Sequence, residues 1–600
     1  MEEPTRIDGY APIRQYAALG DRRTSALVAL DGTVDWLPLP DFAAPGVFGA
    51  IVDAERGGRF ELQPAEPFKA ERRYIPETNV LETTFETSGG RVRVTDALAL
   101  PGAPTLPWNE LTRRIEGLSG NVPMRWRVSP RFEWTERGTV SRGEGTPVIT
   151  HGKYSLAVQA WDAGEPETGD GDVAGSFTIR DGERALLALG CFHAEPILLS
   201  DRDAVEARLD ETASYWRAWL SAVEYDGPWH DEVIRSALAL GLLVDAQTGA
   251  MVAAPTTGLP EKVGGSRNFD YRYAWLRDTS FALDAMLQLG HGTQVHGTLS
   301  WVLAATRRTH PHLRPYYKLD GSYDPSASKL PLSGYRGSTP VLDGNPAESQ
   351  LQLGNYGDLL ETAWRYVSDG NRLDPESALR LREVVDLVCR IWRNPDASIW
   401  ELGERHDYTQ SKLACWDALE CALKMVDGGH LSSRDSDRWR AVHGELRDYI
   451  ERECWSDKRN AYTRYPGTDE VDAATLLIAR MGYLELPDPR MEGTIAALRS
   501  ELGRGPLLYR YSGMEDKEGA FIVCSFWLVE ALALAGRIHE AEEVMAAMCD
   551  LANDVGLLSE EVDPESHELL GNFPQALSHL GVINGAVALA NARDRVASVR

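Results

Sequence analysis

The sequence has 600 residues, with 62 Lys and Arg against 90 Asp and Glu, which gives a formal net charge of −28. This acidic balance argues against a broad surface for nucleic acids or anionic membranes, because both need clustered Lys and Arg. The N-terminal segment has neither a basic start nor an apolar core, so we expect no signal peptide. No run of about 18 apolar residues occurs, so we expect no membrane anchor. The seven cysteines form no CxxC pair, which favours reduced thiols. These features predict a soluble, cytoplasmic protein of several domains.

Up to about residue 200 the pattern is typical of short β-strands. Residues 25–39 are two apolar runs separated by Asp31-Gly32, which is a strong hairpin signal. Other segments alternate or run apolar between Gly, Pro and Asp clusters, namely 91–100, 123–134, 147–161 and 183–192. We therefore predict an antiparallel β-sandwich over residues 1–202, with the acidic, glycine-rich tract 163–175 as a solvated loop.

The periodicity changes after Asp203. Residues 204–223 place apolar side chains three and four positions apart, as an amphipathic helix does, and we interpret 203–227 as a linker helix. Helical patterns then recur without intervening strands and without a repeat of roughly 34 or 40 residues, which favours a closed ring of helix pairs over an open solenoid. The predicted helices cover 232–248, 275–289, 294–308, 348–368, 374–393, 411–426, 433–453, 469–482, 488–502, 519–535, 538–554 and 576–592.

The loop RNFDYRYAWLRD (267–278) concentrates aromatic, arginine and aspartate side chains at the start of a predicted helix. Aromatic rings cover the C–H faces of a sugar, and charged groups make directional hydrogen bonds to its hydroxyls. The alternative is a helix entry with an aromatic core and a surface Arg–Asp pair, and the residues alone leave both interpretations open.

Two further loops carry candidate acids. Glu401 follows Ile399-Trp400. A carboxyl desolvated by a tryptophan has a raised pKa, which a general acid needs. The alternative is a surface residue, because most Glu residues lie on the surface. Glu560 and Glu561 are adjacent, so in an extended segment they would point to opposite faces, one toward a pocket and the other solvated or ion-paired. The alternative for this pair is a charged turn.

Other chemistries find less support in the sequence. No GxGxxG, GxxxxGK[ST], GxSxG or HExxH motif stands in a suitable context. His310 and His312 form an HPH segment, which we interpret as a polar helix end rather than a metal site. Arg510 precedes an acidic turn and either contacts a substrate, orients a carboxylate or forms a structural salt bridge.

Taken together, these segments resemble glycoside hydrolase family 15, the family of glucoamylases, glucodextranases and bacterial trehalases, in its bacterial form. The resemblance implies a multi-domain β plus all-α fold, with an N-terminal antiparallel β-sandwich followed by an (α/α)6 catalytic barrel over 228–600. Order and spacing agree along most of the chain, in the segments 16–42, 252–261, 267–290, 332–341, 399–419, 518–537 and 556–584.

The resemblance also implies roles for individual residues. Glu401, which follows the Ile-Trp pair, corresponds to the general acid of the family. Glu560, the first Glu of the SEE segment, corresponds to the general base. Tyr271 corresponds to a tyrosine that lies near the nucleophilic water. Arg510 resembles the family arginine that borders the next subsite, and the loop at 334–337 resembles the one that closes the pocket. The substrate-binding residues that we expect are Trp275, Arg277, Asp278, Tyr335, Arg336, Trp400 and Arg510.

The implied activity is an inverting, exo-acting α-glucoside hydrolase that releases glucose from the non-reducing end of malto- or isomalto-oligosaccharides or trehalose. We expect a small α-glucoside as the only class of partner besides a possible homo-oligomer, and neither a metal nor another cofactor. The alternatives are a catalytically silent carbohydrate-binding protein on the same fold and a hydrolase of a different α-glycoside. The chain departs from the family pattern at Phe269, at 342–345, at 353–358 and at 408–412. These departures leave the two glutamates intact but put the identity of the leaving group, and of the sugar itself, in question.

Overall fold

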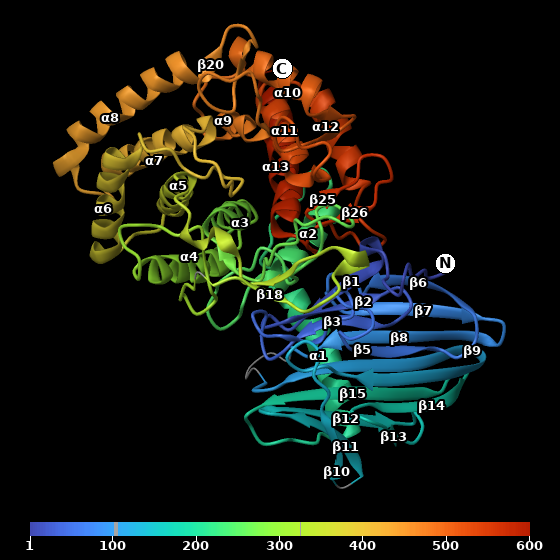
Figure 1. The fold of residues 1–600 in the computed structure, drawn as a ribbon. Coiled ribbons are helices and arrows are strands. Elements are labelled where there is room, and N and C mark those ends of the chain that lie inside the picture. Colours follow the sequence, from blue (N-terminus) through green and yellow to red (C-terminus); the bar gives the residue numbers. More distant parts are fainter. Residues whose placement is uncertain (101–105, 144, 325, 600) are drawn as a thin grey trace.

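The computed structural model describes residues 1–600 apart from 101–105, 144, 325 and 600. The strands of the N-terminal third stack in layers at one end of the molecule, and the helices of the rest of the chain form a ring at the other end (Figure 1). Helix α1 (Arg202–Leu220) runs between these two parts of the chain. Its N-cap is Asp201, whose carboxylate accepts a hydrogen bond from the Ala204 N–H, as short acidic side chains do at helix starts.

The β-region is a two-layered antiparallel sandwich connected by one long strand, β9 (Asn109–Ser129). The first half of β9 pairs with β8 and β15, and the second half pairs with β5 and β14. The strand changes layer near Gly120, which has a φ of 68° that a glycine adopts without strain. The other strands are β1 (Tyr16–Gly20), β2 (Ser25–Ala29), β3 (Val34–Pro38), β4 (Gly46–Phe48), β5 (Arg59–Pro64), β6 (Phe68–Tyr74), β7 (Leu81–Thr87), β8 (Gly90–Leu98), β10 (Thr139–Gly143), β11 (Thr146–His151), β12 (Tyr154–Trp161), β13 (Glu167–Thr168), β14 (Val173–Arg180) and β15 (Arg184–His193).

The helical region is a closed double ring. The inner helices α3, α5, α7, α9, α11 and α13 follow one another around the ring, and α13 packs back on α3. The alternate helices lie outside, as α2 does on α13 and α12 does on α11. The bounds are α2 (His230–Leu243), α3 (Leu276–Gln288), α4 (Gly292–Thr306), α5 (Gly354–Ser368), α6 (Pro375–Ile391), α7 (Thr409–Asp427), α8 (Ser436–Tyr449), α9 (Leu477–Arg480), α10 (Pro489–Glu501), α11 (Ile522–Leu534), α12 (Ile538–Cys549) and α13 (Ala576–Val599).

The sequence explains the two kinds of helix. The inner helix α11 is apolar on nearly every face and is buried from Ile522 to Ala533, as a helix surrounded by protein must be. The outer helices α6 and α10 begin at Asp-Pro pairs, in which the Asp side chain caps the helix and the Pro occupies its first turn.

The predicted fold class, a β-sandwich followed by an (α/α)6 barrel, is confirmed. One local expectation was wrong: the tract 163–175 contains the short strand β13 and the start of β14, because strand pairing at the edge of the sandwich overrides its polar composition. Within the described residues, no helix is long and apolar enough to cross a membrane.

The sandwich contacts the segments that lead into the centre of the helical ring. The indole N–H of Trp36, on β3, donates to the carbonyl of Pro255 at 2.8 Å. Arg272 donates to the carbonyl of Ala44 at 2.8 Å and forms salt bridges with Asp270 and Asp343. The β-region thereby contacts the residue that follows Tyr271 and the segment 254–256, which pairs with the backbone of Tyr271.

Candidate active site

A cavity of about 140 Å³ lies where the loops before α3, α5, α7 and α11 converge. This volume is well below the roughly 300–1,000 Å³ of sites for drug-sized ligands, so the cavity suits a ligand fragment of about one sugar ring. Its lining residues are Glu261, Arg267, Phe269, Tyr271, Arg277, Asn345, Pro346, Ala347, Gln350, Ile399, Trp400, Glu401, Leu402, Gly403, Arg510 and Phe521.

Glu401 lies in the loop between α6 and α7. Its φ of 59° is in the left-handed region, which a non-glycine residue adopts only where its surroundings fix it. One such contact is the hydrogen bond that the Gln350 side chain donates to the Glu401 carbonyl at 3.0 Å. The Trp275 indole N–H donates to Glu401 Oε1 at 2.5 Å, and Arg277 Nη1 is 3.9 Å from the same oxygen. Burial raises the pKa of Glu401, and Arg277 and Trp275 lower it, with burial the larger effect. A carboxyl with a raised pKa can hold a proton for a leaving group.

Arg277 and Asp278, in the first turn of α3, form a buried ion pair beside Glu401. Arg277 Nε donates to Asp278 Oδ1 at 2.8 Å, and Arg277 Nη1 donates to the carbonyl of Ile399 at 2.8 Å. Asp278 is completely buried, whereas Arg277 lines the cavity. The pair therefore ties α3 to the loop of Glu401 and places fixed charged groups where a sugar hydroxyl could bind.

Glu560 stands just before β25 (Glu561–Val562), the middle strand of a small sheet with β24 (Ala520–Phe521) and β26 (Leu569–Leu570). Its Oε2 accepts from the Asn572 N–H at 3.3 Å, and within the described residues Oε1 is buried without a hydrogen-bond partner. Gly571 allows this arrangement, because a Cβ there would lie 2.5 Å from Oε2. Burial and the charge of Glu261 raise the pKa of Glu560 to about 8, while Tyr271 lowers it.

Tyr271 connects the two predicted catalytic glutamates. Its ring lines the cavity that contains Glu401 and lies 5.2 Å from the ring of Trp275. Burial raises the pKa of its hydroxyl, and the charges of Glu560, Glu261 and Glu401 raise it further. The hydroxyl therefore stays protonated and can donate hydrogen bonds. The structure thus brings Glu401 and Glu560 to the surroundings of one tyrosine.

Trp400 and Arg510 form another part of the wall. The Trp400 indole N–H donates to both carboxylate oxygens of Asp472, at 2.9 and 3.1 Å, so it is not a donor to Glu401. The Arg510 guanidinium lies 5.6 Å from the Trp400 ring centroid and 5.1 Å from that of Phe521. These contacts fix the orientation of an arginine that reaches the cavity.

Tyr335 and Arg336, which sequence reasoning placed at the substrate, do not line this cavity. Tyr335 is fully buried, and its hydroxyl donates to the carbonyl of Ala11 at 3.3 Å. Arg336 Nη1 forms a 2.6 Å salt bridge with Glu568. The loop that carries both residues therefore joins the β-region to the helical ring.

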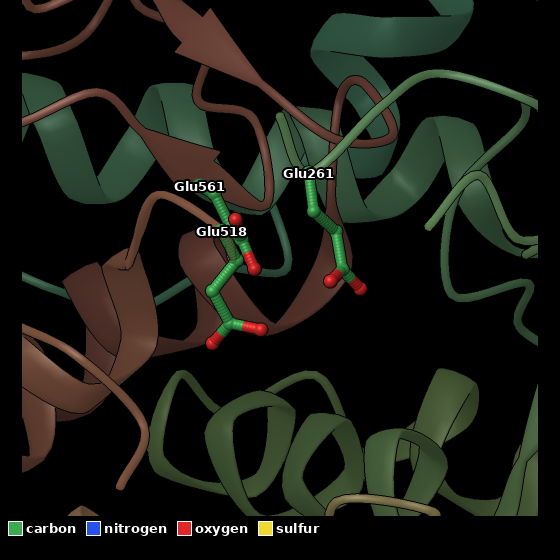
Figure 2. A group of neighbouring side chains, drawn as sticks. All are labelled: Glu261, Glu518 and Glu561. Carbon is green, nitrogen blue, oxygen red and sulfur yellow. The ribbon is translucent and has the colours of Figure 1, made fainter. Parts of the chain in front are cut away.

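Sequence reasoning missed a group of buried glutamates next to the cavity, Glu261, Glu518 and Glu561, which we call the carboxylate cluster. The figure shows Glu261 entering from one segment and the other two from C-terminal segments (Figure 2). One oxygen from each of the three lies within 4.8 Å of the others. Segments far apart in the chain supply them, so spacing gave no signal, although Glu261 ends the motif at 252–261 and Glu561 is the second acid of the adjacent pair.

Comparisons with known proteins agree with this geometry. Residues 227–541 match the sequence model of glycosyl hydrolases family 15, and residues 7–147 match that of the trehalase-like N-terminal domain. A trehalase of Thermoplasma volcanium is 32% identical over 599 residues, covering 98% of this chain and 95% of the relative. A trehalase of Mycolicibacterium smegmatis is 32% identical over 645 residues, covering 99% of this chain and 94% of the relative. A bacterial glucoamylase solved with acarbose superposes with a TM-score of 0.72 at 13% identity, covering 99% of this chain and 98% of that one.

The chain therefore belongs to glycosyl hydrolase family 15 and is a glycoside hydrolase.

Proposed function

We propose that this member of glycosyl hydrolase family 15 is an inverting, exo-acting α-glucosidase that releases glucose from short α-glucosides, with trehalose as its preferred substrate. The observation that carries the proposal is that Glu401, which lines the cavity, and Glu560, which is buried, lie on either side of one residue, Tyr271. Trehalose comes first because the curated relatives named above are trehalases. Short malto- and isomalto-oligosaccharides come second.

In the proposed mechanism Glu401 is the general acid and Glu560 the general base. Glu401, protonated and held by Trp275, gives its proton to the glycosidic oxygen as the bond breaks. Glu560, once ionised, takes a proton from a water that attacks the opposite face of the sugar. Inversion requires this water between base and sugar, and hence carboxyls about 6.5–9.5 Å apart.

Arg277 and Asp278 would select a terminal glucose. Their hydrogen bonds to each other leave fixed charged groups beside the cavity. A sugar that lacks the matching hydroxyls leaves such groups unpaired, which lowers kcat/KM for that sugar. Trp400 and Arg510 would border the departing sugar, as the family resemblance suggests.

Replacing each glutamate with glutamine tests the assigned roles. Because acid and base each contribute about 10²–10⁴-fold to such a reaction, we expect Glu401→Gln and Glu560→Gln to lose at least 100-fold in glucose release from trehalose. A fluoride leaving group needs no protonation, so Glu401→Gln should retain more activity on α-glucosyl fluoride than Glu560→Gln does. Unchanged glucose release by both variants would refute the roles and favour the alternative of a silent binding protein.

The anomer released first tests the stereochemistry. Proton NMR of the first turnover of trehalose, maltose, isomaltose, kojibiose, nigerose or maltotriose should show β-glucose as the new product. With trehalose an inverting enzyme releases one β-glucose and one α-glucose, because the departing glucose keeps its α-configuration, whereas a retaining enzyme releases only α-glucose. Absence of fresh β-glucose would therefore contradict inversion. The substrate with the highest kcat/KM in this panel decides between trehalose and the other linkages.

We further propose that the enzyme acts in the cytoplasm and forms homo-oligomers. The seven cysteines are unpaired thiols in the structure, as expected in a reducing compartment. Cell fractionation tests the location, and light scattering of the purified enzyme tests the assembly.

A further inference from the structure

Glu261 is the one member of the carboxylate cluster that lines the cavity. It ends the segment 252–261, which the β-region holds through the Trp36–Pro255 hydrogen bond. Its Oε2 accepts from Arg510 at 3.1 Å and from Arg267. Its Oε1 is buried and, within the described part of the chain, has no hydrogen-bond partner.

The carboxylate cluster differs from a cation site, because a guanidinium already lies at its centre. Arg510 Nη2 contacts Glu518, lies 3.1 Å from Glu261 Oε2, and is 3.9 Å from Glu561 Oε1. Arg267 Nη2 adds a second positive charge 3.5 Å from Glu518. The two arginines therefore fix Oε2 of Glu261 and, with it, the plane of the whole carboxylate.

An acceptor without a partner is costly inside a protein. Leaving a buried acceptor unsatisfied costs about 1–3 kcal/mol, and more when the group is charged. The Oε1 of Glu261 is such an acceptor, on a residue that borders the cavity. A sugar hydroxyl is a donor of the right kind, and a hydrogen bond to a fixed carboxylate is about twice as strong as one between neutral groups.

We propose that Glu261 is a substrate-binding carboxylate, fixed by Arg510 and Arg267, whose Oε1 accepts a hydrogen bond from one hydroxyl of the bound glucoside. The proposal rests on the proposed function and adds to it a specificity contact that neither the motif pattern nor the family resemblance supplied. It explains why the arginines converge on this side of the cavity: they hold a third carboxylate near the two catalytic ones.

The position of Glu261 also affects the base. The groups that surround Glu560 are Glu261, Tyr271, Arg510 and Asn572, with Glu561 next to it in the chain. The charge of Glu261 raises the pKa of Glu560. Removing that charge lowers the pKa of Glu560. The limb of the pH–rate profile that reports ionisation of the base should therefore move to lower pH in Glu261→Gln.

A cycle between protein and substrate variants tests the contact. The substrates are trehalose and analogues that each lack one hydroxyl, and the enzyme variants are Glu261→Gln and Glu261→Asp. In Glu261→Gln the amide oxygen should turn to the arginines and leave an NH₂ group toward the hydroxyl, so we expect kcat/KM on trehalose to fall about 10–100-fold, mostly through KM. The loss should shrink to about threefold or less for the one analogue that lacks the bonded hydroxyl.

Glu518→Gln is the matched control, because Glu518 holds the same arginine but does not line the cavity. Its loss should be equal for all analogues, since it acts through Arg510 and Arg267 and not on a substrate hydroxyl. Glu261→Asp keeps the charge but retracts the oxygen, and should restore the pH profile without restoring KM. Equal losses across all analogues in both Glu261 variants would overturn the proposal, while glucose release that survives in Glu401→Gln and Glu560→Gln would overturn the proposed function instead.

Discussion

At the scale of single residues, the two tryptophans near Glu401 have different partners. The sequence suggested that Trp400, the preceding residue, sets the environment of the acid. In the structure Trp275 donates to Glu401, whereas Trp400 donates to Asp472. The hydrogen bond from Trp275 stabilises the ionised form of Glu401 and opposes the effect of burial on its pKa.

This difference leads to a prediction for Trp275→Phe. Loss of the indole donor should raise the pKa of Glu401 further, because the ionised form loses a hydrogen bond. The basic limb of the kcat/KM profile, which reports loss of the acid's proton, should move to higher pH, and kcat should fall about 10-fold or more because the acid is less well oriented. Steady-state kinetics between pH 4 and 10 measure both effects.

Trp400→Phe is the control for that prediction. It removes an indole N–H that donates to Asp472, from a tryptophan that precedes Glu401 and lines the cavity. Its basic limb should stay where the parent enzyme has it, whatever happens to KM. Equal shifts in both variants would show that ring contacts, rather than the Trp275 hydrogen bond, control Glu401.

The site could be predicted from the sequence only where local motifs carried it. Glu401, Glu560, Tyr271 and Arg277 stand in segments whose order resembles the family. Glu401, Tyr271 and Arg277 line the cavity, whereas Glu560 is buried next to Tyr271 and does not line it. The proposed role of Glu261 was missed because it depends on the guanidinium of Arg510, which comes from a distant segment, together with that of Arg267, six residues away. Such convergence is a property of the tertiary fold and leaves no periodicity in the sequence.

At the scale of elements, α5 carries a buried acid below the Arg277–Asp278 pair. Asp358 is 8% exposed, and burial raises its pKa to about 8, with a further contribution from the charge of Glu361 and an opposite one from Arg277. A group whose pKa is raised in the folded state stabilises the fold most at low pH. That stability is lost as the pH rises from the ordinary value of an aspartate, about 4, toward 8.

Asp358→Asn should therefore change stability in a pH-dependent way. The amide cannot ionise, so the variant should match the parent near pH 4 and become more stable than the parent by about 1–3 kcal/mol near pH 8. Urea unfolding at several pH values measures the difference. Asp369→Asn, at the exposed C-terminal end of the same helix, should show no such trend. A constant difference at all pH values would mean that Asp358 acts through packing or hydrogen bonding instead.

Elements also show why sequence patterns fail locally. Most helices of the ring were predictable because their apolar residues recur at helical spacing over three or more turns, and their order matches the structure. The helix expected over 469–482 is the exception, because the structure has there only a 3-10 turn (Ala473–Leu476) and the four-residue α9. The first half of β9 was not predicted, because Gly117, Gly120 and charged side chains interrupt its alternation. Those glycines are needed where the strand passes from one layer of the sandwich to the other, so a tertiary requirement produced the interruption.

At the scale of the whole molecule, the β-region joins the helical ring next to the segment that carries the base. Arg72, on β6, donates to both carboxylate oxygens of Asp554, at 2.8 and 2.7 Å, and to the carbonyl of Gln15 at 2.7 Å. Asn553 donates to the carbonyl of Tyr16 at 2.7 Å. These contacts fix the chain a few residues before Glu560, so the sandwich and the catalytic geometry should be lost together.

Arg72→Met tests this coupling. The Arg72 side chain is fully buried, and its loss leaves backbone carbonyls without their donor, but Asp554 is 39% exposed and can regain water. We therefore expect a loss of about 2–3 kcal/mol, somewhat less than the 3–5 kcal/mol typical of breaking a fully buried pair. Calorimetry should still show one transition for sheet and ring, shifted to lower temperature, with activity lost over the same range.

Arg73→Met is the control: Arg73 lies on the same strand, and its side chain is 68% exposed. This variant should keep a free energy of unfolding within about 0.5 kcal/mol of the parent. If Arg72→Met instead splits unfolding into two transitions and activity follows only the later one, the ring holds its catalytic geometry without the sandwich.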